Sequence, residues 1–125
     1  MARLATTDGD GNPHLVPICF AFDEATDSIY SAVDAKPKTT PDLKRLRNIE
    51  HNPNVTLLVD HYDDDWTTVW WVRVDGRAEV RDRDQRAVEL LAAKYLQYAD
   101  EPGHLGRIVV VRATKWTSWA YADPV

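Results

Sequence analysis

Short segments in which large apolar residues alternate with polar or small ones recur along the whole of this 125-residue sequence. Such alternation is typical of a β-strand with one buried face. Turn-forming residues separate most of the segments, which are residues 3–7, 14–22, 29–33, 54–60, 66–80 and 107–119. The sequence therefore predicts a mainly β, α+β protein with six to seven mostly antiparallel strands.

Residues 14–22 indicate which side of a strand faces the core. The even positions carry the larger apolar side chains, namely Val16, Ile18, Phe20 and Phe22. We expect this even face to be buried. Pro17 removes a ladder N–H, which indicates an edge strand or a bulge, and the smaller face is open to a ligand or a loop. The turn-rich residues 8–13 predict a hairpin with residues 3–7.

The longest strand-like segment, residues 66–80, contains an aromatic side chain that is expected to face outward. Because side chains of a strand alternate between its two faces, Trp70, Val72 and Val74 are expected on one face and Val69, Trp71 and Arg73 on the other. Trp71 is thus an outward aromatic beside an arginine. The dipeptide Asp75-Gly76 interrupts the segment and indicates a turn or a bulge.

Two segments have helical periodicity instead. The first begins at Thr40-Pro41, which suit the N-cap and the first helical position, and ends at Asn52-Pro53. Its apolar stripe is Leu43, Leu46 and Ile49. The second helix is expected to run from Asp84, as N-cap, to Tyr98.

Length and composition favour one compact domain, residues 1–125. The single cysteine, Cys19, cannot form an intramolecular disulfide, and no apolar stretch approaches the roughly 20 residues that span a bilayer. We therefore expect a cytoplasmic protein with no membrane partner. Its net charge of −5 argues against a nucleic-acid partner.

Positive charge is concentrated in one short segment. Residues 36–47 contain five cations and one anion, whereas the rest of the chain has a net charge of −9. Part of this charge lies at the expected start of a helix, where free N–H groups favour an anion. The segment is either a phosphate or carboxylate site or a solvated helix face.

Four segments carry a family resemblance. They are Gly11-Asn12-Pro13-His14-Leu15-Val16-Pro17, Lys36-Pro37-Lys38, Lys44-Arg45-Leu46-Arg47-Asn48-Ile49 followed by Asn52-Pro53, and Trp70-Trp71-Val72-Arg73-Val74-Asp75-Gly76. In this order and spacing they resemble the pyridoxamine 5′-phosphate oxidase-like split β-barrel superfamily, and more narrowly its branch that uses the deazaflavin coenzyme F420. The resemblance covers nearly the whole chain. It implies an FMN-binding-like split β-barrel as the single domain.

The resemblance also implies a set of cofactor-binding residues. Lys44 and Arg45 match an adjacent basic pair that holds the cofactor phosphate through charge-assisted hydrogen bonds. Lys36-Pro37-Lys38 lies upstream and extends the cationic groove toward the acidic tail that F420 has and FMN lacks. Arg47 and Asn48 are neighbours of the pair, although Arg47 equally suits a position on the helix surface.

Trp71 departs from the pattern of the flavin oxidases, which commonly carry a glutamine near the isoalloxazine ring at this position. A tryptophan there either flanks the ring or closes the dimer interface. The departure puts FMN-dependent amine oxidation in doubt. A second departure is that Met1 falls directly on the first strand, so the usual N-terminal helix of the family is expected to be absent.

The resemblance implies an oxidoreductase that transfers a hydride between F420 and a small unsaturated substrate. It also implies a homodimer with the cofactor at the subunit interface. The cofactor supplies the chemistry in such an enzyme, so we assign no catalytic residue and no metal ligand. Two alternatives remain open: an FMN-binding oxidase or reductase of the same superfamily, and a non-enzymatic protein that binds a flavin, a deazaflavin or haem.

Overall fold

The computed structural model describes residues 1–34, 43–100 and 105–122, and seven antiparallel strands in these residues form one sheet. The strands are β1 (Ala2–Thr7), β2 (Pro13–Ile18), β3 (Ala21–Asp23), β4 (Ser28–Asp34), β5 (Asn54–His61), β6 (Trp70–Arg81) and β7 (Leu105–Ala120). The helices are α1 (Lys44–His51), α2 (Gln85–Lys94) and α3 (Leu96–Asp100), with a 3₁₀ turn, η1, at Trp66–Thr68. The predicted α+β split barrel with six to seven strands is confirmed.

The sheet closes on itself because its two edge strands are consecutive in the chain. The strand order is β2-β1-β5-β6-β7-β4-β3, so β2 and β3 lie at opposite ends. At Cys19 and Phe20, between β2 and β3, the chain stops pairing with β1 and begins to pair with β4. At this point the Tyr95 hydroxyl satisfies the backbone of Phe20 in place of a neighbouring strand. It accepts from the Phe20 N–H at 3.0 Å and donates to the Phe20 carbonyl at 3.1 Å.

Several sequence-based expectations hold in this arrangement. The β1–β2 hairpin is formed, and Pro17 lies on an edge strand. Asp84 caps α2, because its carboxylate accepts from the Ala87 N–H at 3.0 Å. Helix α1 ends at His51 with Asn52 as its C-cap, as the Asn52-Pro53 stop predicts.

Other expectations are wrong in detail. The described part of α1 has Leu43 as its N-cap and starts at Lys44, whereas the predicted start at Thr40-Pro41 lies outside the described residues. The single helix predicted up to Tyr98 is interrupted, because Tyr95 adopts extended backbone and its hydroxyl bonds to Phe20. The side chain of Phe22 lies on the predicted inner face but is 41% exposed, because β3 ends at the open mouth of the barrel.

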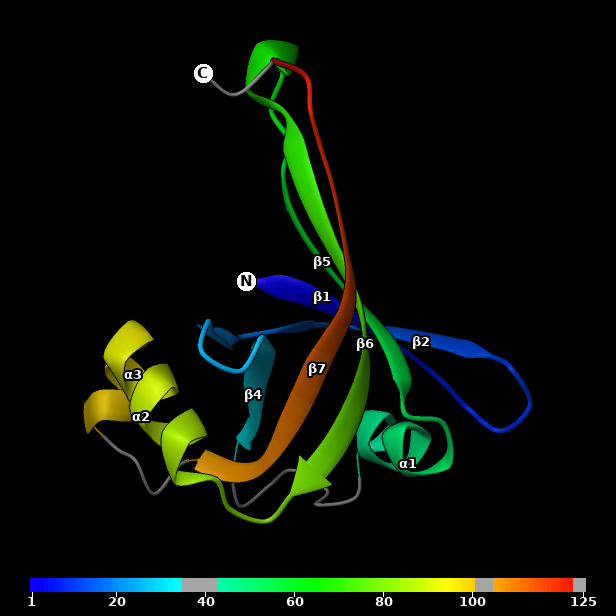
Figure 1. The fold of residues 1–125 in the computed structure, drawn as a ribbon, viewed down its shortest axis with the longest axis vertical. Helices are drawn as coiled ribbons and strands as arrows, with labels where there is room; N and C mark the ends of the chain where they lie inside the picture. Colours follow the sequence, from blue (N-terminus) through cyan, green and yellow to red (C-terminus); the bar gives the residue numbers. More distant parts are fainter. Residues whose placement is uncertain (35–42, 101–104, 123–125) are drawn as a thin grey trace.

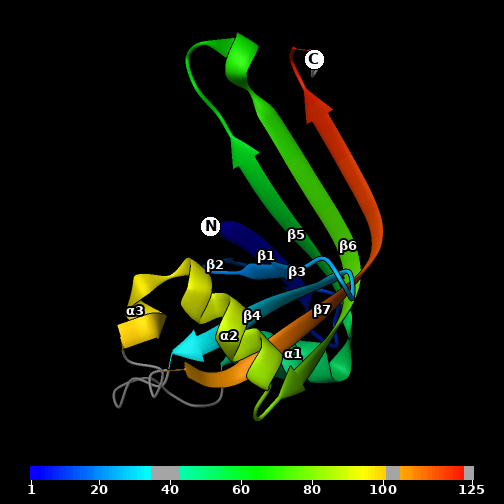
Figure 2. The ribbon, with the colours of Figure 1, turned by 60° about the vertical axis from the view of Figure 1, so that its left-hand side comes forward.

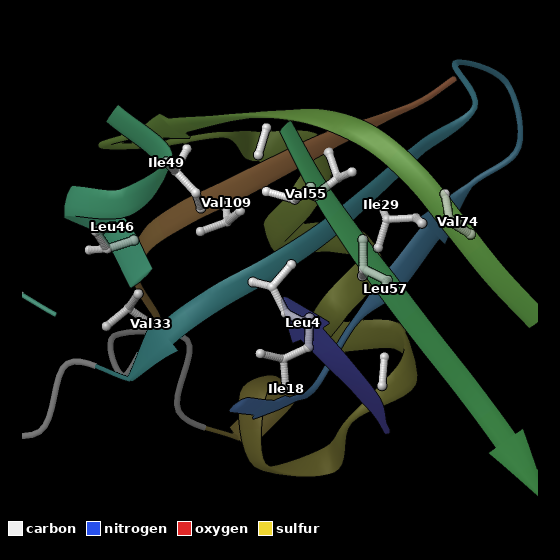
Figure 3. Packing of buried hydrophobic residues seen from close by; sticks show 13 residues of the cluster. Leu4, Ile18, Ile29, Val33, Leu46, Ile49, Val55, Leu57, Val74 and Val109 are labelled. Atoms are coloured by element: carbon white, nitrogen blue, oxygen red, sulfur yellow. The ribbon is translucent and has the colours of Figure 1, made fainter. Parts of the chain in front are cut away.

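Two apolar clusters hold the sheet. Figure 3 shows the interior cluster. Helix α1 and every strand except β3 contribute to it. Its labelled members are Leu4, Ile18, Ile29, Val33, Leu46, Ile49, Val55, Leu57, Val74 and Val109. The second cluster packs α2 and α3 on the outer face of β3, β4 and β7, through residues such as Leu91, Tyr98 and Val110.

The described residues contain no helix that is long and apolar enough to cross a membrane.

The ends of β5, β6 and β7 extend beyond the barrel as a three-stranded arm (Figures 1 and 2). The arm comprises residues 56–61 of β5, 70–75 of β6 and 115–120 of β7, which pair with one another. At its base the β6–β7 register jumps from Asp75 opposite Lys115 to Gly76 opposite Ala113. The predicted interruption at Asp75-Gly76 is therefore a bulge, and the extra residue is Thr114 in β7.

Candidate functional site

The outer face of the arm carries a groove lined mainly by aromatic side chains, with a volume of about 710 Å³. We call it the tryptophan groove. It is lined by Thr56, Leu58, Asp60, Tyr62, Trp66, Val69, Trp70, Trp71, Arg73, Trp119 and Tyr121. Concave, mainly apolar surfaces with a few polar groups are the usual form of a small-molecule site.

The bulge at Thr114 decides which tryptophans share this groove. Side chains alternate between the two faces of β7, and one extra residue reverses the alternation beyond it. Trp119 consequently lies opposite Trp71 on the outer face. Trp116 lies opposite Val74 on the inner face and contacts Phe22, with 5.5 Å between the ring centroids.

A cation and an unsatisfied hydroxyl accompany the aromatic rings. The Arg73 guanidinium carbon lies 5.5 Å from the centroid of the Trp71 ring, within the range of a cation–π contact. Thr117 lies directly opposite Arg73, and its Oγ1 is buried without a hydrogen-bond partner. Such an atom is rare in proteins, although Thr117 is not among the residues that line the groove.

A more polar cavity continues the groove along the same face of the sheet. It has a volume of about 310 Å³ and shares Thr56 with the tryptophan groove. The Thr56 hydroxyl donates to the Asp75 carboxylate at 2.8 Å, and Arg3 of β1 pairs with Asp60 of β5. The cavity extends to Asn52 and Asn54, next to the end of α1.

The cationic residues predicted to hold a phosphate lie at the start of α1. Lys44 and Arg47 are exposed and Arg45 is half-buried, and no acidic residue occupies the first turn. Cations at this end oppose the helix dipole, so they do not stabilise α1 through it. Lys36, Pro37 and Lys38 lie outside the described residues.

Lys44 also lies close enough to the β1–β2 turn to act on Asp8. Hydrogen bonds from the backbone N–H and side chain of Asn12 and from the backbone of Asp10 lower the pKa of Asp8, and the charge of Lys44 adds to this effect. The β1–β2 turn and the start of α1 are therefore neighbours in the fold.

Asn48 serves the core in this structure. Its side chain is 4% exposed, and its Nδ2 donates to the Thr6 hydroxyl on β1 at 3.0 Å. His14 lies opposite Thr6 on β2, and its Nδ1 is buried without a partner. The β1–β2 register places this imidazole beside Thr6, which the local sequence alone does not show.

Within one chain, Trp71 and the cations of α1 do not meet. Leu46 and Ile49 pack α1 into the interior cluster with Ala78, near the far end of β6. Trp71 precedes Ala78 by seven residues, or roughly 23 Å of strand, and it faces the outside of the arm. Trp71 and the cations of α1 therefore lie at separate places within one chain.

Comparison with known proteins places this geometry in a family. The family model described as pyridoxamine 5′-phosphate oxidase matches residues 1–120. No curated protein matches the chain.

Solved structures with low sequence identity share the fold. A conserved hypothetical protein, Rv2991 from Mycobacterium tuberculosis, has a TM-score of 0.72 at 22% identity, over 95% of this chain and 76% of the other. HutZ, the heme storage protein from Vibrio cholerae, has a TM-score of 0.71 at 15% identity, over 95% and 84%. A candidate pyridoxamine 5′-phosphate oxidase from Lactobacillus delbrueckii has a TM-score of 0.61 at 22% identity, over 93% and 82%.

Proposed function

The chain belongs to the pyridoxamine 5′-phosphate oxidase family, and we propose that it is an F420-dependent oxidoreductase that acts as a homodimer. The observation that carries the proposal is the tryptophan groove, in which Trp71 and Trp119 lie on adjacent strands beside Arg73. A flat ring system suits these aromatic walls, and Arg73 and Asp60 offer it polar contacts.

The proposed roles of the residues follow from their positions. Trp71 and Trp119 hold the ring of the cofactor and exclude water from it, and Arg73 supplies positive charge at the edge of the groove. Lys44 and Arg45 hold the phosphate, and Lys36 and Lys38 extend the cationic surface toward an acidic tail. Bound F420 supplies a carbon that accepts or donates a hydride, so the protein needs only to position the cofactor and a small unsaturated substrate.

The separation between Trp71 and α1 favours a site shared by two chains. In a two-fold symmetric dimer, the α1 of one protomer completes the tryptophan groove of its partner, and the reverse holds at the second site. Trp66 is 63% exposed and Trp119 is 46% exposed, and exposed aromatics of this kind are enriched in protein interfaces.

FMN is the second candidate ligand, because flavin binding is common in this family. The groove accepts either ring system, so the number of negative charges on the ligand is the discriminating property. Five cations between residues 36 and 47 favour the more anionic F420.

A fluorescence titration of purified protein tests this function. We expect F420 to bind more tightly than FMN, and Lys44→Ala with Arg45→Ala to weaken F420 binding at least tenfold, or about 1.4 kcal/mol, through loss of charged hydrogen bonds. Arg83→Ala removes an exposed cation elsewhere and should leave binding unchanged. Equal affinity of the double variant and the parent would exclude the assigned phosphate site, and tighter binding of FMN would favour the second candidate.

A further inference from the structure

Two arginines face each other across β6 and β7. Arg77 lies directly opposite Arg112 in the register of the two strands, and both side chains are exposed. Like charges directly opposite on neighbouring strands destabilise a sheet. The pair is therefore unfavourable unless something of opposite charge lies between the two guanidinium groups.

The backbone holds this juxtaposition rigidly. Gly76, next to Arg77, lies so close to β7 that a Cβ there would be 2.5 Å from the Arg112 carbonyl oxygen. The Thr114 hydroxyl donates to the Asp75 carbonyl at 3.0 Å and fixes the bulge beside the pair. These contacts oppose a change of register that would separate the two arginines.

The two arginines line a groove of about 650 Å³, which we call the arginine groove. Its lining is Pro53, Arg77, Ala78, Glu79, Arg81, Val110, Arg112, Ala113 and Thr114. Three arginines and one glutamate give this lining a net charge of +2, in a protein whose net charge is −5. The groove lies on the same face of β6 as Trp71, six residues or roughly 20 Å farther along the strand.

No carboxylate of the groove neutralises the pair. Glu79 is engaged by Arg81, which also pairs with Asp84. Burial opposes the charge of Arg81, but the hydrogen bonds from Glu79 and Asp84 outweigh it and raise the pKa of Arg81 above its ordinary value. Arg77 donates at 3.4 Å to the neutral side chain of Asn54, and Arg112 has neither a hydrogen bond nor an ion pair within the described parts of the chain.

We propose that the arginine groove binds a phosphate group, either as inorganic phosphate or as part of a small phosphomonoester. Two guanidinium groups that line one groove from paired positions can each donate two hydrogen bonds to a tetrahedral oxyanion. Val110 and Ala113 supply an apolar wall for the organic part of an ester. This site uses none of the residues assigned to the cofactor.

NMR of the arginine Nε–Hε groups in the cofactor-free protein tests the proposal at constant ionic strength. We expect the signals of Arg77 and Arg112 to shift saturably when inorganic phosphate replaces chloride, and the same signals to respond to glycerol phosphate. Tighter binding of glycerol phosphate identifies an ester as the ligand, and equal affinity identifies free phosphate. No greater shift with phosphate than with chloride would overturn the proposal.

Matched variants separate this site from general charge effects. Arg112→Gln should weaken phosphate binding at least tenfold, whereas Arg83→Gln, which removes an exposed charge outside the groove, should not. Without phosphate, Arg112→Gln should be at least as stable as the parent, because it removes the repulsion. Equal phosphate affinity of the two variants would contradict the assignment. Loss of binding in Lys44→Ala, with no loss in Arg112→Gln, would assign the phosphate to α1 instead.

Discussion

At the scale of single residues, the hydrogen bond between Asn48 and Thr6 shows how one polar side chain can have two interpretations. The family resemblance makes Asn48 a cofactor-binding residue, as a neighbour of Lys44 and Arg45. In the structure, it lies beside Leu46 and Ile49 on the buried side of α1 and bonds to β1. Helical periodicity identifies the buried side, but only the packing of α1 on β1 supplies the partner.

Asp23 is a second buried polar residue, and it predicts how stability depends on pH. Its side chain is 3% exposed and accepts hydrogen bonds from Tyr30, Ala25 and Arg86. Burial acts to raise the pKa of Asp23, but the hydrogen bond and charge of Arg86, together with bonds from Thr26 and Tyr30, lower it below the ordinary value of 3.8. The folded protein therefore favours the ionised form.

Because the folded pKa is lowered, the stability that Asp23 contributes is present above pH 3.8 and is lost as the pH falls below that value. We expect Asp23→Asn to be less stable than the parent at neutral pH and to lose less stability on acidification. Urea unfolding between pH 7 and pH 3 measures both effects. Asp10→Asn, at an exposed position, is the control, and equal acid sensitivity of Asp23→Asn and the parent would contradict the account.

At the scale of elements, the bulge at the base of the arm determines the composition of the site. The sequence indicated an interruption at Asp75-Gly76, and the alternation of residues 66–80 correctly placed Trp71 and Arg73 on one face. The extra residue lies in β7, however, at Thr114, where nothing in the local pattern marks it. Trp119 could therefore not be assigned to the same groove as Trp71 from the sequence alone, since its face depends on the pairing of two distant strands.

The close approach of the two strands at this bulge makes Gly76 sensitive to substitution. A Cβ at this position would meet the Arg112 carbonyl oxygen at 2.5 Å and the Val111 Cγ1 at 2.8 Å. We expect Gly76→Ala to lower the free energy of unfolding by about 1–3 kcal/mol, the range for overpacking. Chemical denaturation measures this change.

Gly9→Ala is the matched control, because no atom lies within 4 Å of a Cβ at Gly9. This variant should differ from the parent by less than about 0.5 kcal/mol. A similar loss for both variants would show that backbone freedom, and not the contact between β6 and β7, makes Gly76 necessary.

At the scale of the whole molecule, the barrel and the arm have separate roles. The barrel and the base of the arm bury the interior cluster, and α1 packs at one end of the barrel. The arm extends three strands beyond the barrel (Figure 1), and its outer face carries the aromatic side chains of the tryptophan groove. The number of strands, the antiparallel pairing and the fold family could be predicted from the sequence. The distance between Trp71 and α1 could not, because it depends on where α1 packs along β6. That distance is the reason for proposing a site built from two chains.

A heterodimer made from two different variants tests this central claim. One chain carries Lys44→Ala and Arg45→Ala, the other carries Trp71→Ala, and each bears its own affinity tag so that only mixed dimers are purified. Each variant alone should bind F420 weakly. In the mixed dimer, the unaltered α1 of one chain faces the unaltered Trp71 of the other, so about half of the sites should regain the affinity of the parent. A mixed dimer that binds no better than the two variants would contradict a shared site.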